Sequence, residues 1–297
     1  SPVATLDLSE ASQQVASLQI ASNNTASNTV TIGVGHTLTV DGIGGFRVGI
    51  VNTAKSQTRV VFGGGGSLVV NNTAANFESG LQTATSVIPG ATPPADATSN
   101  TNTSATDLSG LGSFTANVNE FRVAHGLNNT STLTLSNTSN NITANVVQVA
   151  NSVTWNSGTG TMILGAGTNV IATNTLNIGL AKGSGSVRFA SQTAGSAGTV
   201  VIGGKTTALV DINVANSLNV GTSASPSGTL DLRDHIATVS ADGLIIGKRG
   251  SSGNGGTVGN VYFDGGTFTA NTIEIGTMGG GALGNAAGTL TVSGGTF

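Results

Sequence analysis

Residues 270–276 read ANTIEIG, and residues 241–247 read ADGLIIG. Both segments carry Asn or Asp at the second position, an aliphatic residue at the fourth and sixth positions, and Gly at the seventh. Apolar residues at alternate positions are typical of a β-strand with one buried face. Glycine at its end suits a tight corner, because glycine adopts backbone conformations that other residues avoid. The pair therefore predicts a short strand followed by a sharp turn.

Six further segments repeat this pattern along the chain. They are VASLQIA (15–21), IGGFRVG (43–49), VNEFRVA (118–124), ANVVQVA (144–150), TNTLNIG (173–179) and ANSLNVG (215–221). The sixth position is aliphatic in all eight segments and is predicted to point into a core. Its residues are Ile20, Val48, Val123, Val149, Ile178, Val220, Ile246 and Ile275. The seventh position is Gly or Ala every time, which predicts a recurrent corner.

The second position predicts a ladder of polar side chains. Six of the eight segments place an amide or carboxylate there, namely Asn119, Asn145, Asn174, Asn216, Asp242 and Asn271. Asn and Asp tolerate the left-handed backbone of a sharp turn, and stacked copies can hydrogen-bond to one another. We interpret this set as a structural corner ladder.

A second alternating motif trails the first. Its copies are HTLTV (36–40), STLTL (131–135), GSVRF (185–189), GTLDL (228–232), GNVYF (259–263) and GTLTV (288–292). A third motif, GGTF, follows at 265–268 and 294–297. Three strands and three corners make one coil, and the cleanest intervals between first-motif strands are 26 to 29 residues. That period predicts a three-sided solenoid in which each strand pairs with its equivalent one coil away.

The repeat predicts one solenoid domain over residues 1–297, with about nine or ten coils and a length on the order of 45 Å. Residues 83–110, rich in Pro, Thr, Ser and Asn, show almost no alternation and are expected to leave the solenoid as an excursion loop. Residues 198–204 and 208–214 are expected to form one irregular coil.

Composition narrows the function. Only 8 % of the 297 residues are charged, against about 25 % in an average domain, and the net charge is −3. Without a basic cluster, nucleic acid is not expected as a partner. No apolar run is long enough to span a bilayer as a helix. The low charge and the abundance of Thr, Ser and Asn favour an extracellular or cell-surface location.

The units GTLDL, GNVYFDGGTFTANTIEIG and GTLTVSGGTF resemble the autotransporter-associated β-strand repeats of bacterial surface proteins. The resemblance covers residues 115–297 well and 14–70 loosely. It implies a secreted or cell-surface right-handed β-helix of a bacterium that serves in adhesion, as a stalk or in self-association. The chain departs from the autotransporters in two respects, since nothing in it resembles their translocator barrel and no secretion signal precedes Ser1.

The best candidate for chemistry is the segment DLRDHIATVSAD, with Asp231, Arg233, Asp234, His235 and Asp242. Enzymes on β-helices that cleave polysaccharides need paired carboxylates or an acidic Ca²⁺ site. Alternation places Leu230 and Leu232 inside, so Asp231 and Arg233 should face solvent as a structural ion pair. His36, His125 and His235 lack the spacing of metal ligands and are interpreted as surface or corner residues. We therefore assign no catalytic, cofactor-binding or metal residues, expect no cofactor, and do not predict an enzyme.

Thr-x-Thr recurs at residues 37–39, 132–134 and 289–291, which raises the question of an ice-binding face. At the outward position of Thr134, other coils place Arg188, Asp231 and Tyr262. A regular flat ladder of threonines, and with it an ice-binding face, is therefore not predicted.

Both ends of the chain read as ordinary coils. Thr5–Leu8 repeats the TLDL of residues 229–232, and the chain stops on an alternating run. Solenoids usually end in a polar cap, because the last coil otherwise exposes its apolar side chains. The sequence thus predicts an all-β, right-handed, three-sided parallel β-helix that self-associates head to tail through Leu6, Leu8, Leu290, Val292 and Phe297. Two alternatives stay open: an adhesin or stalk segment that binds a carbohydrate or matrix ligand, and a polysaccharide-active β-helix enzyme.

Overall fold

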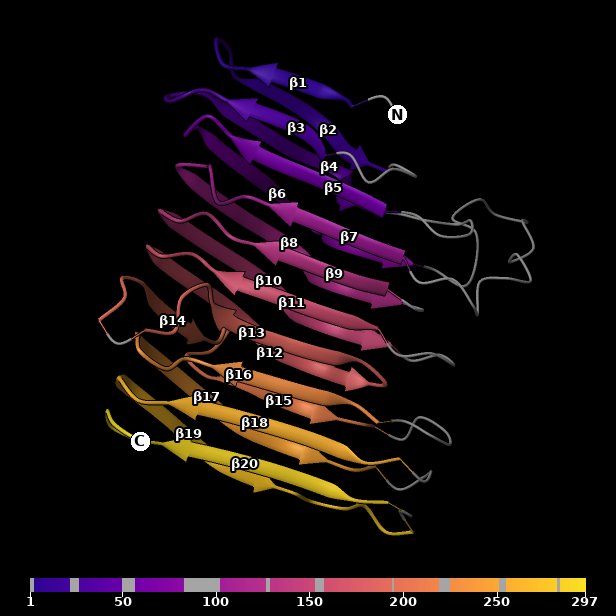
Figure 1. The fold of residues 1–297 in the computed structure, drawn as a ribbon, viewed down its shortest axis with the longest axis vertical. Coiled ribbons are helices and arrows are strands. Elements are labelled where there is room, and N and C mark those ends of the chain that lie inside the picture. The colour runs from indigo at the N-terminus through magenta and orange to yellow at the C-terminus, as the bar shows by residue number, and fades with distance from the viewer. Residues whose placement is uncertain are drawn as a thin grey trace, which may run out of the picture.

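The structure is a computed structural model that describes residues 3–21, 27–49, 57–82, 102–126, 129–152, 158–193, 195–218, 225–250, 255–281 and 284–297. Over these ranges every regular element is a β-strand, and the strands stack along the long axis of the molecule from β1 to β20 (Figure 1). No helix in these ranges has the length and apolar character that a membrane span requires.

The described strands form two parallel sheets. Sheet A contains, in spatial order, β1 (Thr5–Leu8), β3 (Ser27–Ile32), β5 (Gln57–Gly63), β7 (Asn102–Asp107), β9 (Asn129–Thr134), β11 (Thr159–Leu164), β13 (Ser184–Phe189), β16 (Ser227–Asp231), β18 (Thr257–Phe263) and β20 (Ala286–Val292). Sheet B contains β2 (Gln13–Ile20), β4 (Thr37–Val48), β6 (Ser67–Gln82), β8 (Ser113–Gly126), β10 (Ser139–Ser152), β12 (Thr168–Ala181), β14 (Thr199–Gly203), β15 (Val210–Asn216), β17 (Ile236–Lys248) and β19 (Gly266–Ile275).

The chain crosses from one sheet to the other in each coil, and each strand pairs with its equivalent one coil away. In sheet B, β10 pairs in parallel with β8 and with β12, and in sheet A, β11 pairs in parallel with β9 and with β13. This arrangement is a β-solenoid and confirms the predicted all-β repeat fold. The handedness of the coil and its number of sides stay predictions.

Strands of sheet B change phase near their middle. In β10 the side chains of Ile142 and Ala144 are buried, but the next buried residues are Val147 and Val149, so Asn145 interrupts the alternation. Asn119, Asn174, Asp242 and Asn271 occupy the same position in their own strands. We call these five residues the corner column.

The core is a set of axial columns of apolar side chains. Phe46, Phe77 and Phe121 belong to one such column, with ring centroids 4.6 Å apart for the first pair and 4.3 Å for the second. The ring planes differ by only 2° and 3°, and all three residues are 0 % exposed. The column continues through Val147, Leu176, Ile212, Leu244 and Ile273. Stacked coils therefore bury what a single coil cannot.

The predicted corner is confirmed at Gly49, Ala124, Ala150, Gly179, Gly247 and Gly276, which share a positive φ between 54° and 73°. It is not confirmed at Ala21, which is not among the residues with a positive φ, and Gly221 lies outside the described residues. Gly80 and Ala215, which the repeat did not place at a corner, adopt the same backbone, with φ of 77° and 58°. This left-handed backbone is costly for residues with a large side chain. At Gly247 an added Cβ would also lie 2.0 Å from the carbonyl oxygen of Ala287, so a steric clash excludes alanine there.

The predicted coil at 215–221 is wrong. The strand that continues the core column is β15, in which Ile212 pairs with Leu176 on one side and Leu244 on the other. Residues 208–214 and 215–221 both read as alternating apolar strands, and their common pattern hid which of them is in register. Of the residues assigned to that coil, Val220 lies outside the described residues, and Val214 takes its inward position.

The predicted excursion 83–110 is wrong over its last part. Residues 83–101 lie outside the described residues, whereas Asn102–Asp107 form β7 between β5 and β9. The inward side chains of β7 are polar, so the sequence does not show the alternation of apolar and polar residues by which a strand is recognised. They are buried because hydroxyls pair with one another: Ser104 Oγ lies 2.9 Å from Ser131 Oγ, and Ser79 Oγ lies 2.8 Å from Thr106 Oγ1.

Two smaller assignments also change. A coil that the repeat did not reveal passes through Phe77 and Ser79 in β6, where serine stands in the column otherwise filled by Val and Ile. HTLTV at 36–40 lies in β4 of sheet B, whereas the five other copies of the second motif lie in sheet A. Alternation predicts a strand, but it does not say which sheet the strand joins.

Candidate functional site

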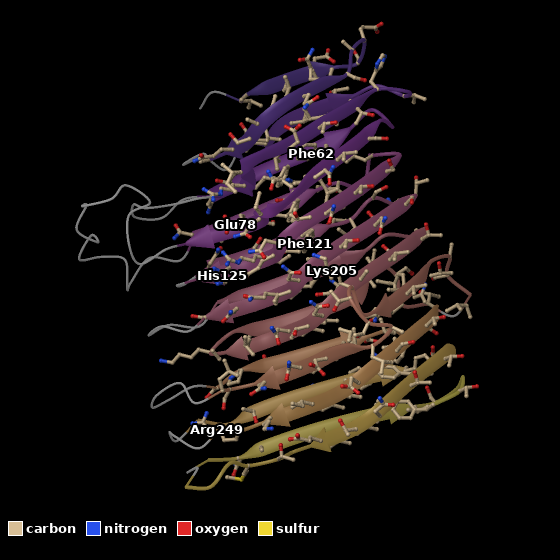
Figure 2. All side chains as sticks on the ribbon, turned by 180° about the vertical axis from the view of Figure 1, so that it is seen from behind. Phe62, Glu78, Phe121, His125, Lys205 and Arg249 are labelled. Atoms are coloured by element: carbon tan, nitrogen blue, oxygen red, sulfur yellow. The ribbon has the colours of Figure 1, made fainter. Side chains whose placement is uncertain are left out.

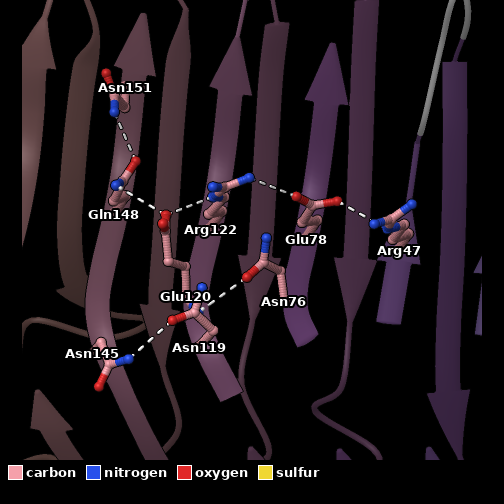
Figure 3. A network of polar contacts seen from close by, with 9 residues as sticks. All are labelled: Arg47, Asn76, Glu78, Asn119, Glu120, Arg122, Asn145, Gln148 and Asn151. Atoms are coloured by element: carbon pink, nitrogen blue, oxygen red, sulfur yellow. Dashed lines mark hydrogen bonds and ion pairs between the residues drawn. The ribbon is translucent and has the colours of Figure 1, made fainter. Parts of the chain in front are cut away.

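A cluster of charged and polar side chains lies on the outward side of sheet B. Glu78 accepts a hydrogen bond from Arg122 Nη1 at 2.8 Å and contacts Arg47 Nε at 3.2 Å (Figure 3). Arg122 Nε also donates to Glu120 Oε2 at 2.8 Å. The cluster continues through Gln148, which donates to Glu120 and accepts from Asn151. We call these six residues the polar network.

Glu78 differs from its neighbours in burial. By strand alternation it points outward, yet its side chain is only 2 % exposed, against 30 % for Arg47 and 19 % for Arg122. A buried carboxylate is tolerated when cations and hydrogen bonds compensate for its lost hydration. Its two oxygens contact two guanidinium groups from the neighbouring coils, so this charge cluster ties three coils together.

His125 lies at the same edge of the molecule as Glu78 (Figure 2). The pKa of His125 is lowered to about 4, chiefly by burial and also by the nearby charge of Arg122, while Glu120 opposes the shift. Its Nδ1 is buried and has no hydrogen-bond partner in the described structure. The imidazole is therefore neutral in the folded protein at pH 7.

Acid should destabilise the protein through His125. Because its pKa is about 4 when folded and 6.5 when unfolded, the unfolded chain binds the proton more readily between these values. The contribution of neutral His125 to the free energy of unfolding is fully present above pH 6.5 and is lost as the pH falls towards 4, by about 3 kcal/mol in total. Denaturant unfolding followed by circular dichroism across this pH range measures the loss.

Replacement of His125 by Gln should remove this part of the pH dependence. The remaining slope would then come from other groups. If the variant and the parent chain lose the same stability between pH 6.5 and 4, His125 does not cause the acid sensitivity.

The corner column holds two hydrogen-bonded pairs. Asn145 Nδ2 donates to Asn119 Oδ1 at 2.9 Å, and Asn271 Nδ2 donates to Asp242 Oδ1 at 2.8 Å. Asn174 lies in register between these pairs but accepts instead from the backbone N–H and the hydroxyl of Thr206. The predicted ladder therefore forms in two places.

Asn216 does not belong to the corner column. It pairs in register with Leu180 and Lys248, and its Nδ2 donates to Asn213 Oδ1 at 3.1 Å. Its placement in the ladder followed from the misassigned coil at 215–221 and is wrong for the same reason.

A six-residue loop, 204–209, replaces the single corner residue between β14 and β15. Lys205 Nζ reaches back to Asn145 Oδ1 at 2.9 Å. Below the loop lies an open cavity of about 280 Å³, lined by Asn174, Thr206, Thr207, Leu209, Asp211 and Asp242. Sequence reasoning missed this cavity, although the longer interval between Leu176 and the next coils marked the irregular turn that builds it.

The predicted cluster around Asp231 is only partly assembled. Arg233 Nε donates to Asp231 Oδ1 at 2.8 Å, and its guanidinium lies 4.4 Å from the centre of the Tyr262 ring. Leu230 and Leu232 are buried as expected, but Asp231 is 5 % exposed rather than open to solvent. Asp242 lies in the corner column instead of beside Asp231.

The electrostatics of Asp231 suit an ion pair. Burial acts to raise its pKa, but hydrogen bonds from Arg233 and Gln192 outweigh burial and lower it. A general acid needs a raised pKa at neutral pH, so this carboxylate is set up to stay ionised. The carboxylate of Asp264 is also engaged in a structural contact, because both its oxygens accept a hydrogen bond from the backbone N–H of Asp234.

His235 is buried rather than on the surface. It is 5 % exposed, its ring stacks on Phe189 with centroids 3.6 Å apart, and its Nε2 lies 2.7 Å from the carbonyl oxygen of Ser191. His36 is half-buried in the turn before β4. Among the described residues, no three His, Cys, Asp or Glu side chains gather in a way that could hold a metal ion.

The residues predicted for a head-to-tail interface lie at the two ends of the molecule, at β1 and at β20 with the segment after it. Leu6 is 39 % exposed, Val292 is 41 % exposed and Phe297 is 45 % exposed. Leu290 is partly buried, and Leu8 is buried at 8 %. Phe297 stacks on Phe268 with ring centroids 5.1 Å apart and so begins a further level of sheet B.

Comparison with known proteins finds no family model, no curated protein and no solved structure that matches the chain, so its function has to be argued from its own geometry.

Proposed function

We propose that the protein is a structural rod of the cell exterior whose end coils are covered by further β-solenoid coils, supplied in solution by a second copy stacked head to tail. The observation that carries this proposal is a sharp change in exposure at the last coil. Ile246 and Phe263 are 0 % exposed, whereas their partners one level further on, Ile275 and Val292, are 44 % and 41 % exposed.

The first coil shows the same change in the opposite direction. Phe46 and Val48 are 0 % exposed, but Leu18 and Ile20, which pair with them on the outer side, are only partly buried. In sheet A, Leu6 is 39 % exposed while Val30 beneath it is 3 % exposed. Each end thus presents aliphatic residues that the interior coils bury.

Stacking also suits the backbone. β1 and β20 are the two edge strands of sheet A. An edge strand offers unpaired backbone N–H and C=O groups to another strand. Two different ends that fit one another form a heterologous contact, which repeats without closing and gives a filament. In this arrangement Leu6 and Leu8 of one copy lie over Val292 and the residues beside it on the next.

Assembly of the 297-residue chain tests the proposal. We expect light scattering after gel filtration, and electron microscopy, to show rods that are multiples of about 45 Å long and that lengthen with protein concentration. Val292→Lys places a charge on the exposed aliphatic stripe and should leave single rods. Thr291→Lys is the matched control, because Thr291 is the outward neighbour on the same strand and should not block stacking.

Two outcomes contradict the proposal in different ways. Single rods at every concentration would show that copies do not cover one another, which favours the alternative of a stalk segment within a longer chain. Equal loss of assembly in both lysine variants would show that the aliphatic stripe is not the contact.

A further inference from the structure

Four consecutive strands of sheet A carry a hydroxyl at each of two outward positions. The register aligns Thr130, Thr159, Ser184 and Ser227 in one column, and Thr132, Thr161, Ser186 and Thr229 in the next. We call these eight residues the hydroxyl grid. All eight outward positions on β9, β11, β13 and β16 in these two columns are Thr or Ser, and none is charged.

The grid lies over a packed interior. The inward residues between its two columns are Ser131, Gly160, Gly185 and Gly228. The inward residues that follow the second column on β11, β13 and β16 are Met162, Val187 and Leu230, and each is 0 % exposed. Strands of a sheet lie about 4.8 Å apart, and side chains two residues apart on a strand are separated by about 6.7 Å. The eight hydroxyls therefore repeat regularly in two directions.

These hydroxyls differ from those of sheet B in one respect. On sheet B, Ser113 Oγ donates to Ser67 Oγ at 2.8 Å, and Thr168 Oγ1 lies 3.5 Å from Ser139 Oγ. Within the described part of the chain, no grid hydroxyl hydrogen-bonds to another protein group. Each grid hydroxyl can therefore donate and accept outward.

The edge of the grid explains why the sequence pattern argued against it. The next outward column runs through Thr134, Ile163, Arg188 and Asp231, so it breaks the regularity. Thr134 belongs to that irregular column, whereas Thr132 belongs to the grid. Only the strand register separates the two positions.

We propose that the hydroxyl grid binds ice. A partner that engages all eight hydroxyls at once must be neutral and must repeat in two dimensions, as an ordered water lattice does. Five of the eight residues are threonines, whose methyl groups order neighbouring water while their hydroxyls bond to it. Sites that bind a sugar chain usually present an aromatic ring on which the sugar stacks, and the grid contains none. This inference goes beyond the proposed rod and does not rest on it.

Inhibition of ice recrystallisation by the full 297-residue chain is the test. The parent chain should keep ice grains small, and Thr161→Lys, in the middle of the grid, should abolish the effect at the same concentration. Thr161→Ser keeps the hydroxyl and should retain most of the activity. Thr175→Lys is the control, because Thr175 faces outward on β12 of sheet B, away from the grid.

The measurement is separate from assembly, since it can be repeated on the Val292→Lys chain, where stacking should be blocked. Circular dichroism must first show that each variant keeps its β-structure. A parent chain that fails to restrain ice growth would overturn the inference. So would equal loss in Thr161→Lys and Thr175→Lys, or binding to crystalline cellulose or chitin that Thr161→Lys removes while ice growth is unaffected.

Discussion

Replacing Glu78 by Ala is expected to lower the free energy of unfolding by about 3–5 kcal/mol, because removal of one partner of a buried charge cluster leaves the others uncompensated. Here the uncompensated groups are the guanidinium groups of Arg47 and Arg122, which contact Glu78 from two neighbouring coils. Without the carboxylate they face one another as like charges. Denaturant titration followed by far-ultraviolet circular dichroism measures the loss.

Glu120→Ala is the matched control for Glu78. Its side chain is 24 % exposed and also pairs with Arg122, at 2.8 Å. Because Glu120 is more accessible to solvent than Glu78, its loss leaves less uncompensated buried charge, so this change should cost clearly less, on the order of 1 kcal/mol. Equal losses for the two alanine variants would show that the burial of Glu78 does not set the cost.

The second large effect is expected in the core column. Phe121→Ala removes a ring that stacks 4.3 Å from Phe77 and is 0 % exposed. Truncation of a buried phenylalanine costs about 3–5 kcal/mol, because transfer energy and packing are lost together. Thermal and denaturant unfolding should both shift, and the midpoint of the transition is the safer comparison, because long repeat proteins can depart from two-state behaviour.

Ile273→Ala tests the same column at its end. Ile273 is 40 % exposed, so its truncation should cost well under about 2 kcal/mol in a single rod. A larger loss for Ile273 than for Phe121 would mean that the core is not centred where the aromatic stack lies. In stacked rods the cost of Ile273→Ala should rise, because a second copy would bury the side chain.

Much of the fold could be predicted because the same residue types recur at the same positions of each repeat. Ile178, Ile246 and their equivalents were assigned to the core from alternation, and the Gly or Ala corner was assigned from backbone preference. The coil through Ser79 and the strand β7 could not be predicted, since hydroxyls face inward there. Such hydroxyls are stable inside only because they bond to one another, and a sequence read alone does not show which of them meet.

The sites divide in the same way. The contact of Asp231 with Arg233 was predictable, because two residues on one strand face the same side. The polar network was not, since Arg47, Glu78 and Arg122 meet only through the pairing of three coils. The hydroxyl grid had the same difficulty, because Thr132 and Thr134 look alike until the register assigns them to different columns.

The loop at 204–209 shows how the fold handles a change in chain length. On one side of it β12 pairs with β14, on the other it pairs with β15, and the strand register is recovered within a few residues. Extra residues at a corner are therefore absorbed locally instead of being passed down the stack. A foreign peptide inserted between Gly204 and Leu209 would be displayed on a stiff scaffold at a fixed height, which makes this corner a grafting point for engineered epitopes.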